Sequence, residues 1–217
     1  MQRWLIILLL LLLAGLALLT TVRLAHDDSM SADGKQDFGP SSKQAFLDWA
    51  NANSQRLDAH VEFDKFLDRE GVGGVIPTWQ LMRVDGNYAS RCHTDFFNIP
   101  PREEWPNIVP ALRLVRDEVI PTVGSVAAVS SWRSPAINSC VNGASQSRHL
   151  RFEALDMVAL EVRDTKTLFR QLCELPGAVG RRKGMGPGAY FDPDVLERYK
   201  RGRFHIDASG YRSWGFG

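Results

Sequence analysis

The first two dozen residues of the chain differ in composition from the rest, so the two parts are considered separately. Residues 4–22 are uncharged and apolar apart from two threonines. A helix of this length, at about 1.5 Å rise per residue, would reach about 28 Å, close to the hydrocarbon thickness of a bilayer. Arg23 also stands where a signal peptidase would need a small residue. We therefore expect residues 1–25 to be an uncleaved inner-membrane anchor, with a cleaved signal segment as the alternative and an exported, periplasmic domain in both cases.

The residues after this segment have the composition of a tether followed by one domain. Residues 26–42 are rich in Asp, Ser, Gly and Lys and poor in bulky apolar residues, which is typical of a flexible tether. Residues 43–217 are long enough for one domain with a single core. Lys and Arg total 26 against 25 Asp and Glu, a formal net charge of +1. Because phosphate binding needs excess positive charge, we expect no nucleic-acid partner.

Two segments in the first half of the domain have apolar residues at helical spacing. Residues 44–70 show irregular helical spacing that ends at the glycine-rich residues 71–74, which predicts one or two helices. In residues 107–119 the apolar side chains recur at intervals of four, three and four, which places one face on a core. Pro110 is compatible with this helix in its first turn, and residues 121–124 are predicted to form a turn after it.

A further helix is predicted over residues 164–175, which again carry apolar side chains at helical spacing. Asp164 is placed to cap its N-terminus, because an Asp side chain can accept from the free N–H groups of the first turn. Pro176 and the glycine after it are predicted to end it.

Short apolar or alternating runs predict strands at residues 125–131, 155–160 and 203–208. A polar segment, residues 138–147, is predicted to be a loop between the first two. Helices and short strands therefore mix along one domain, a spacing that fits an α+β fold better than a doubly wound one.

The cysteines indicate a disulfide and not a metal site. Cys92, Cys140 and Cys173 lie far apart and show none of the close pairing of structural zinc sites. In an oxidising compartment two of them can pair, and Cys92 with Cys140 is the preferred pair because both lie in polar, loop-like sequence. Cys173 falls on the apolar face of a predicted helix and is expected to be a free, buried thiol.

A carboxylate lies inside an apolar strand. Asp156 follows His149 by seven residues and has Leu155 and Met157 as neighbours. Burying an unpaired charge costs several kcal/mol after relaxation, so Asp156 needs an Arg, a set of donors or a metal as its partner.

A second pair of polar residues lies near the C-terminus, where His205 and Asp207 alternate with Phe204 and Ile206. Side chains two apart on a strand share a face, so His205 and Asp207 should project together. Such a pair is often only hydrogen-bonded at the surface. Together with the upstream His and Asp, however, it offers three N or O ligands and an open position for water, as catalytic zinc sites require.

Several short motifs, taken in order, resemble the zinc D-Ala-D-Ala carboxypeptidase family and its relatives over residues 106–214. The matching residues are Ser130-Ser131-Trp132-Arg133-Ser134-Pro135, Asn138, Gly143-Ala144, Ser147-Arg148-His149, Ala154-Leu155-Asp156, Phe204-His205-Ile206-Asp207 and Tyr211-Arg212-Ser213-Trp214.

The resemblance implies a fold, a cofactor and a substrate. It implies that His149, Asp156 and His205 bind zinc and that Arg133 contacts the substrate. It also implies an α+β fold with a small antiparallel sheet and peptidoglycan stem peptides as substrate. A guanidinium at Arg133 could bind a terminal carboxylate or support a developing oxyanion, the alternative being a surface salt bridge. Ser147 is expected either to hydrogen-bond the substrate site or to cap a turn.

The chain departs from the family at the general base, because the residues directly before His205 include no acid. Asp207 is the first candidate, either as the base or as the carboxylate that orients a metal ligand. Asp192, Asp194 and Glu197 are further candidates from a polar stretch before the last strand.

The sequence thus predicts a zinc metallopeptidase that hydrolyses an amide bond of a stem peptide, as a carboxypeptidase or an endopeptidase. The missing upstream base keeps open a catalytically weak or inactive zinc module that binds cell-wall peptides or a partner protein. A metal-free exported domain is a third interpretation, and it requires Asp156 to have an organic partner.

Overall fold

The structure is a computed structural model of the chain and describes residues 38–161, 164–192 and 202–216. The predicted anchor and most of the predicted tether lie outside these residues. Among the described residues, every helix is too short or too polar to cross a membrane.

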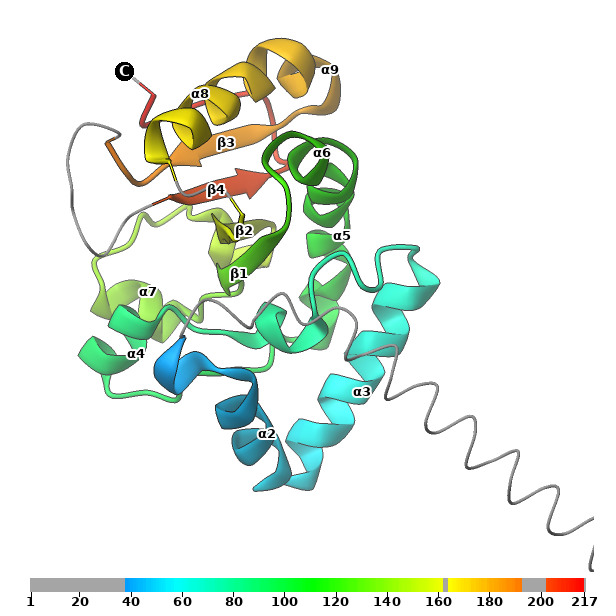
Figure 1. Cartoon of the computed structure of the whole chain (residues 1–217). Helices are drawn as coiled ribbons and strands as arrows, with labels where there is room; N and C mark the ends of the chain where they lie inside the picture. The colour runs from blue at the N-terminus through cyan, green and yellow to red at the C-terminus, as the bar shows by residue number, and fades with distance from the viewer. Residues whose placement is uncertain (1–37, 162–163, 193–201, 217) are drawn as a thin grey trace, which may run out of the picture. The chain divides into compact units, whose positions relative to one another are not determined.

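A four-stranded antiparallel sheet lies at the centre of the described domain (Figure 1). Its strands are β1 (Val126–Ser130), β2 (Ala154–Ala159), β3 (Gly186–Ala189) and β4 (Arg203–Asp207). They are ordered β1-β2-β4-β3, and helices pack around them. The structure therefore confirms an α+β domain with a small antiparallel sheet. Strand β3 was not predicted, because its sequence, Gly-Pro-Gly-Ala, has neither β-branched residues nor alternation.

The two central strands are buried on both faces. In β2, Leu155 and Met157 belong to the hydrophobic core, while Asp156 points to the opposite face and is also fully buried. In β4, Phe204 and Ile206 are the core residues, as the alternation predicted. The core is completed by α5, which packs against β2 and β4, and by α8, which packs against β3 (Figure 1).

The N-terminal part of the described domain is helical. Helices α2 (Lys43–Asn51) and α3 (Ser54–Arg69) confirm the predicted helical segment and show that it is two helices. Asn53 separates them, because its side chain caps α3 by accepting from the Gln55 N–H at 2.9 Å. The chain turns at Gly71 and Gly74, both of which have positive φ.

The predicted helix in the middle of the chain is longer than expected at both ends. Helix α5 (Trp105–Leu114) continues through a π-helical segment (Val115–Val119) into α6 (Ile120–Val123). The predicted first-turn position of Pro110 is wrong, because Pro110 lies inside α5 and Pro106 occupies the first turn. The predicted turn at 121–124 is also wrong.

The helix ends only at Gly124, whose φ of 81° is one that glycine adopts at no cost. A widened π-helical segment of this kind accommodates residues that do not fit the regular hydrogen-bond pattern.

Helix α8 (Thr165–Leu175) begins as predicted and continues further than predicted. The Asp164 side chain accepts from the N–H groups of Lys166 and Thr167. Pro176 does not end the helical path, because a π-helical segment (Pro176–Gly180) leads directly into α9 (Arg181–Lys183). Cys173 on α8 is free, as expected, but it is exposed, so the prediction that it is buried was wrong.

Short helices make up the rest of the described chain. Helices α4 (Gly86–Cys92) and α7 (Pro135–Cys140) lie side by side and are joined by the predicted disulfide between Cys92 and Cys140. The beginning of the predicted loop at 138–147 is therefore helical. The 3-10 helices are η2 (Gly39–Ser41), η3 (Thr78–Met82), η4 (Arg102–Glu104) and η6 (Arg148–Arg151).

Candidate metal centre

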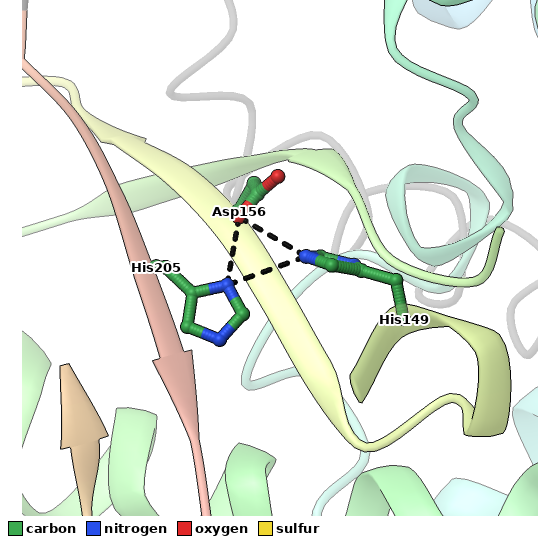
Figure 2. Close-up of side chains that lie close together, drawn as sticks. All are labelled: His149, Asp156 and His205. Atoms are coloured by element: carbon green, nitrogen blue, oxygen red, sulfur yellow. Dashed lines mark hydrogen bonds and ion pairs between the residues drawn. The ribbon is translucent and has the colours of Figure 1, made fainter. Parts of the chain in front are cut away.

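Three side chains from three different elements converge on one point (Figure 2). His149 comes from η6, Asp156 from β2 and His205 from β4. Asp156 Oδ1 lies 3.2 Å from His149 Nε2 and 3.0 Å from His205 Nδ1, and the two imidazole nitrogens are 3.3 Å apart. All three side chains are buried. Their ligand atoms lie within 4.8 Å of one another, so the group could hold one metal ion.

Backbone geometry explains how residues distant in sequence meet here. Asp156 and His205 are direct cross-strand partners in the antiparallel pair of β2 and β4, so their side chains leave the same face as neighbours. His149 reaches the same point from the turn before β2. Phe152 has a left-handed φ of 53° there and redirects the chain from η6 into the strand.

Hydrogen bonds orient both imidazole rings. His149 Nδ1 lies 2.5 Å from the carbonyl oxygen of Ser131, which can only accept, so Nδ1 carries the proton. In the same way His205 Nε2 donates to Asp207 Oδ2 at 2.9 Å. In the neutral rings, His149 Nε2 and His205 Nδ1 therefore direct their lone pairs towards Asp156. Three lone-pair atoms facing one another repel unless a cation lies between them.

The protonation states match this donor set for two of the three residues. Burial lowers the pKa of His149, which favours the neutral imidazole that a metal requires. Burial opposes ionisation of Asp156, but its interactions with His149 and with the Arg203 guanidinium hold the pKa of its carboxyl well below the usual range. Burial also lowers the pKa of His205, but its hydrogen bonds to Asp156 and Asp207 outweigh this and raise it, so a proton would compete with a metal at His205.

Asp156 also has organic partners, in addition to the two histidines. The Arg203 Nη2 group donates to its Oδ2 at 2.6 Å, and the Tyr190 hydroxyl donates to its Oδ1 at 3.0 Å. Arg203 is itself paired through Nη1 with Asp85. The predicted burial of Asp156 is confirmed, but these partners mean that burial alone does not require a metal. The convergence of the three ligand atoms, and not burial, favours a metal at this position.

The donor set fits zinc. Two imidazole nitrogens and one carboxylate oxygen, with no thiolate among them, are the ligands of catalytic zinc sites, which leave a position open for water. His149, Asp156 and His205 would hold the ion. The hydrogen bonds that the two imidazoles donate to the Ser131 carbonyl and the Asp207 carboxylate are the outer contacts that orient such ligands.

Asp207 lies on the far side of the His205 ring, away from the ligand atoms. It is fully buried, and the Ser209 N–H and Arg212 Nη1 donate to its Oδ1 at 2.9 and 3.0 Å. Burial opposes its ionisation, but the hydrogen bond from His205 lowers the pKa of the carboxyl. Of the two roles considered for Asp207, this geometry favours orienting a ligand over accepting a proton from water.

Of the other candidate bases, the structure describes only Asp192. Asp192 is exposed, and Asp194 and Glu197 lie outside the described residues. In the described part of the chain, the acids whose contacts reach the ligand group, directly or through Arg203, are Asp85, Asp156 and Asp207. Each of them is paired with an arginine.

Arg133 lies next to this group and is buried, with 7% of its surface exposed. Its backbone N–H donates to the carbonyl oxygen of His149 at 2.9 Å, and its charge contributes to the lowered pKa of His149. Nη1 donates to Asn138 Oδ1 at 3.2 Å, and Nε is buried without a hydrogen-bond partner. No described carboxylate pairs with Arg133, so the alternative of a surface salt bridge is wrong.

Ser147 is half-buried at the start of η6. Its side chain does not cap that turn, which removes one of its two expected roles. Tyr211 is exposed, whereas the Trp214 ring packs on Gly188 and beside the His205 ring.

Sequence reasoning missed three residues of the centre: Tyr190, Arg203 and Asp85. Arg203 had a signal, because it shares the strand face of His205 two residues later. Asp85 and Tyr190 had none, because only the tertiary structure brings Asp85 to Arg203 and Tyr190 to Asp156.

The fold and the donor set define an α+β protein with a three-residue group that could hold one metal ion. Residues 98–185 match the model of the Peptidase M15 family, peptidases of the zinc D-Ala-D-Ala carboxypeptidase type. The match agrees with the family resemblance over these residues, which are less than half of the chain, and peptidases of this family are zinc-dependent. It includes Arg133, His149 and Asp156 and ends before His205, which the structure adds. No curated protein and no solved structure matches the chain.

Proposed function

We propose that this chain hydrolyses an amide bond in peptidoglycan stem peptides, as a zinc-dependent carboxypeptidase or endopeptidase. The observation that carries the proposal is the convergence of His149, Asp156 and His205 beside buried Arg133, which has no acidic partner among the residues that the structure describes. A ligand set alone supports metal binding. The adjacent guanidinium adds a group able to bind the carboxylate or the oxyanion of a peptide substrate.

Each residue has a defined task in this proposal. When bound, zinc lowers the pKa of a water molecule and polarises a carbonyl group. Ser131 and Asp207 hold the two imidazoles so that their free ring nitrogens face Asp156, where they would bind the ion. Arg203 holds Oδ2 of Asp156, which leaves Oδ1 for the metal. Arg133 binds the negative charge of the substrate, and Ser147 is proposed to assist it.

We place the domain in the periplasm, attached to the inner membrane by residues 4–22, with a cleaved and periplasmic form as the alternative. The length and apolarity of this segment and the Cys92–Cys140 disulfide support this location, because disulfides persist in oxidising compartments.

The full chain, purified in detergent and loaded with zinc, tests the proposal. It is incubated with purified cell-wall sacculi and with defined stem peptides, and the released products are separated and identified. We expect released amino acids or peptides, loss of release on adding a chelator and recovery on adding zinc. Absence of products with the zinc-loaded protein would contradict the proposal.

A second candidate function is a catalytically weak or inactive zinc module that binds cell-wall peptides or a partner protein. The pairing of Asp85, Asp156 and Asp207 with arginines favours it, because none of these carboxylates is left to accept a proton. Zinc-dependent binding of stem peptides without products would support this module.

A further inference from the structure

Helix α4 contacts both parts of the site, although it lies outside the segment that matches the family model. The match begins at residue 98, whereas α4 covers Gly86–Cys92. Its capping residue, Asp85, pairs with Arg203, and Arg203 binds the metal-ligand candidate Asp156. One turn further on, the Tyr88 ring faces the guanidinium of Arg133, with 4.9 Å between Cζ and the ring centroid.

The guanidinium of Arg133 is held from two sides. Tyr88 supplies an aromatic face, and a desolvated cation over such a face is attracted by the ring quadrupole. Asn138 on α7 accepts from Nη1, and its own amide nitrogen donates to the carbonyl oxygens of Gly143 and Ala144. These contacts orient the charge without neutralising it.

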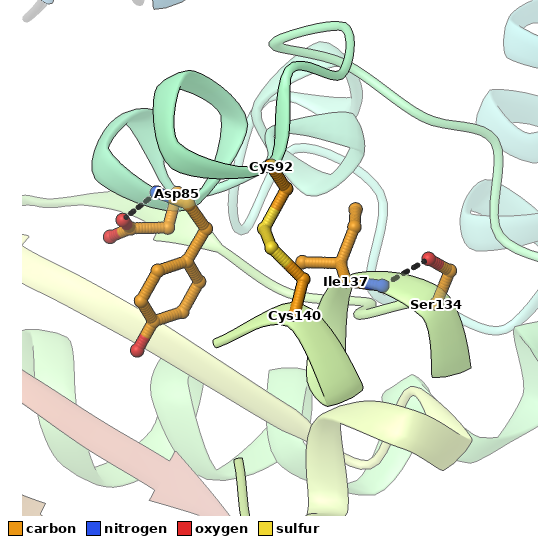
Figure 3. The surroundings of a disulfide bond; sticks show 6 residues. Asp85, Cys92, Ser134, Ile137 and Cys140 are labelled. Atoms are coloured by element: carbon orange, nitrogen blue, oxygen red, sulfur yellow. Dashed lines mark hydrogen bonds between the residues drawn. A yellow bond between two sulfur atoms is a disulfide. The ribbon is translucent and has the colours of Figure 1, made fainter. Parts of the chain in front are cut away.

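The end of α4 is fixed to α7 by the disulfide between Cys92 and Cys140 (Figure 3). Around this bond, Val84, Ala89 and Ile137 form a small hydrophobic cluster separate from the main core. The two elements that orient Arg133 are thus linked to each other covalently and by packing. The start of α4 is fixed as well, because Asp85 accepts from the Tyr88 N–H at 3.0 Å.

We propose that α4 is a positioning element for substrate binding. Its Tyr88 ring holds the guanidinium of Arg133 beside the candidate metal ligands, where it can bind a substrate carboxylate. The disulfide keeps α4 against α7. The inference rests on the proposed role of Arg133. Tyr88 acts through Arg133 and is a positioning residue.

The test compares Tyr88→Leu with Tyr88→Phe in the zinc-loaded full chain. The probes are acetyl-L-lysyl-D-alanyl-D-alanine and the same peptide with a C-terminal amide, and their binding is measured by calorimetry. We expect Tyr88→Leu to weaken binding of the free acid by roughly tenfold, and Tyr88→Phe, which keeps the ring, to stay within about twofold. Binding of the amide and of zinc should not change in either variant.

A double-mutant cycle separates positioning from general packing. In an Arg133→Met background, Tyr88→Leu should cause no further loss of affinity for the free acid, because the interaction it removes is already absent. Equal losses with and without Arg133, or equal losses for acid and amide, would overturn the proposal. If Tyr88→Leu does not fold, Tyr88→Met serves the same cycle.

The disulfide is tested with Cys92→Ser/Cys140→Ser, and Cys173→Ser on α8 is the matched control. The double variant should weaken binding of the free acid severalfold at unchanged zinc affinity, and the control should match the wild type. Unchanged discrimination between acid and amide in the double variant would remove the disulfide from the proposal. The experiment measures peptide binding and not hydrolysis. A wild-type protein that binds the free-acid peptide without hydrolysing it would therefore contradict the proposed function but not this inference.

Discussion

The candidate metal-ligand group and the surroundings of Arg133 are neighbours that are held in place by different means. Asp156, His205 and Asp207 stand on paired strands, so the hydrogen-bonded register of β2 and β4 sets their positions. Arg133 follows β1 in the chain, and its guanidinium is oriented by side chains of α4 and α7.

The two regions also differ in charge balance. The carboxylates near the candidate metal ligands are paired with arginines, whereas Arg133 pairs with no acid among the described residues. A paired charge is part of the scaffold, and an unpaired buried charge is available to a ligand. Metal affinity and substrate affinity should therefore be separable by mutation.

The largest effects are expected at the imidazole ligands. His149→Ala and His205→Ala should each lose zinc and all detectable activity, and their melting temperature should no longer rise with added zinc. His93→Asn is the control, because His93 is exposed with a φ of 50° that Asn tolerates. Metal analysis and thermal unfolding provide the readouts, and wild-type zinc content in either variant would remove that residue from the site.

Arg133→Lys should lower activity by roughly a hundredfold while zinc content and melting temperature stay unchanged. The ammonium group keeps the charge but lacks the planar pair of donors that fits a carboxylate. Steady-state kinetics with a defined stem peptide measure the effect. Wild-type turnover would separate Arg133 from substrate binding altogether.

Asp207→Asn should weaken zinc binding by about tenfold to a hundredfold, with activity largely recovered at excess zinc. The amide retains the shape but is a poorer acceptor for His205 Nε2–H. Titration of activity against zinc concentration gives the answer. Near-zero turnover at saturating zinc would instead identify Asp207 as the general base. The role of Asp207 as a carboxylate that only orients His205 would then be wrong.

The smallest effects are expected from a matched pair of glycines. A Cβ at Gly186 would lie 2.7 Å from Asp207 Oδ2, and one at Gly143 would lie 2.2 Å from Asn138 Oδ1. Gly186→Ala should therefore weaken zinc binding, and Gly143→Ala binding of the free-acid peptide, each by roughly fivefold. Calorimetry measures the affinity of both variants for zinc and for the free-acid peptide. If either variant loses affinity for the other ligand, or for both ligands, the two regions are not separable.

The sequence by itself determined the parts of this protein that depend on local pattern. Alternation predicted β4 with Phe204 and Ile206 in the core, and Asp164 predicted the start of α8, because periodicity and capping are properties of neighbouring residues. The ligand set followed from the resemblance and from residue chemistry. The disulfide was predicted from composition and compartment.

Only the tertiary structure decided how these residues are used. The sequence of strand β3 has almost no hydrophobic alternation. A glycine is needed at position 186 because the Asp207 side chain occupies the space that a Cβ would take there. Which nitrogen of His205 faces Asp156 depends on the Asp207 contact on the other side of the ring. The pairing of Arg203 with Asp85 joins residues 118 positions apart. Such contacts follow from packing of the whole chain, which no local window of sequence contains.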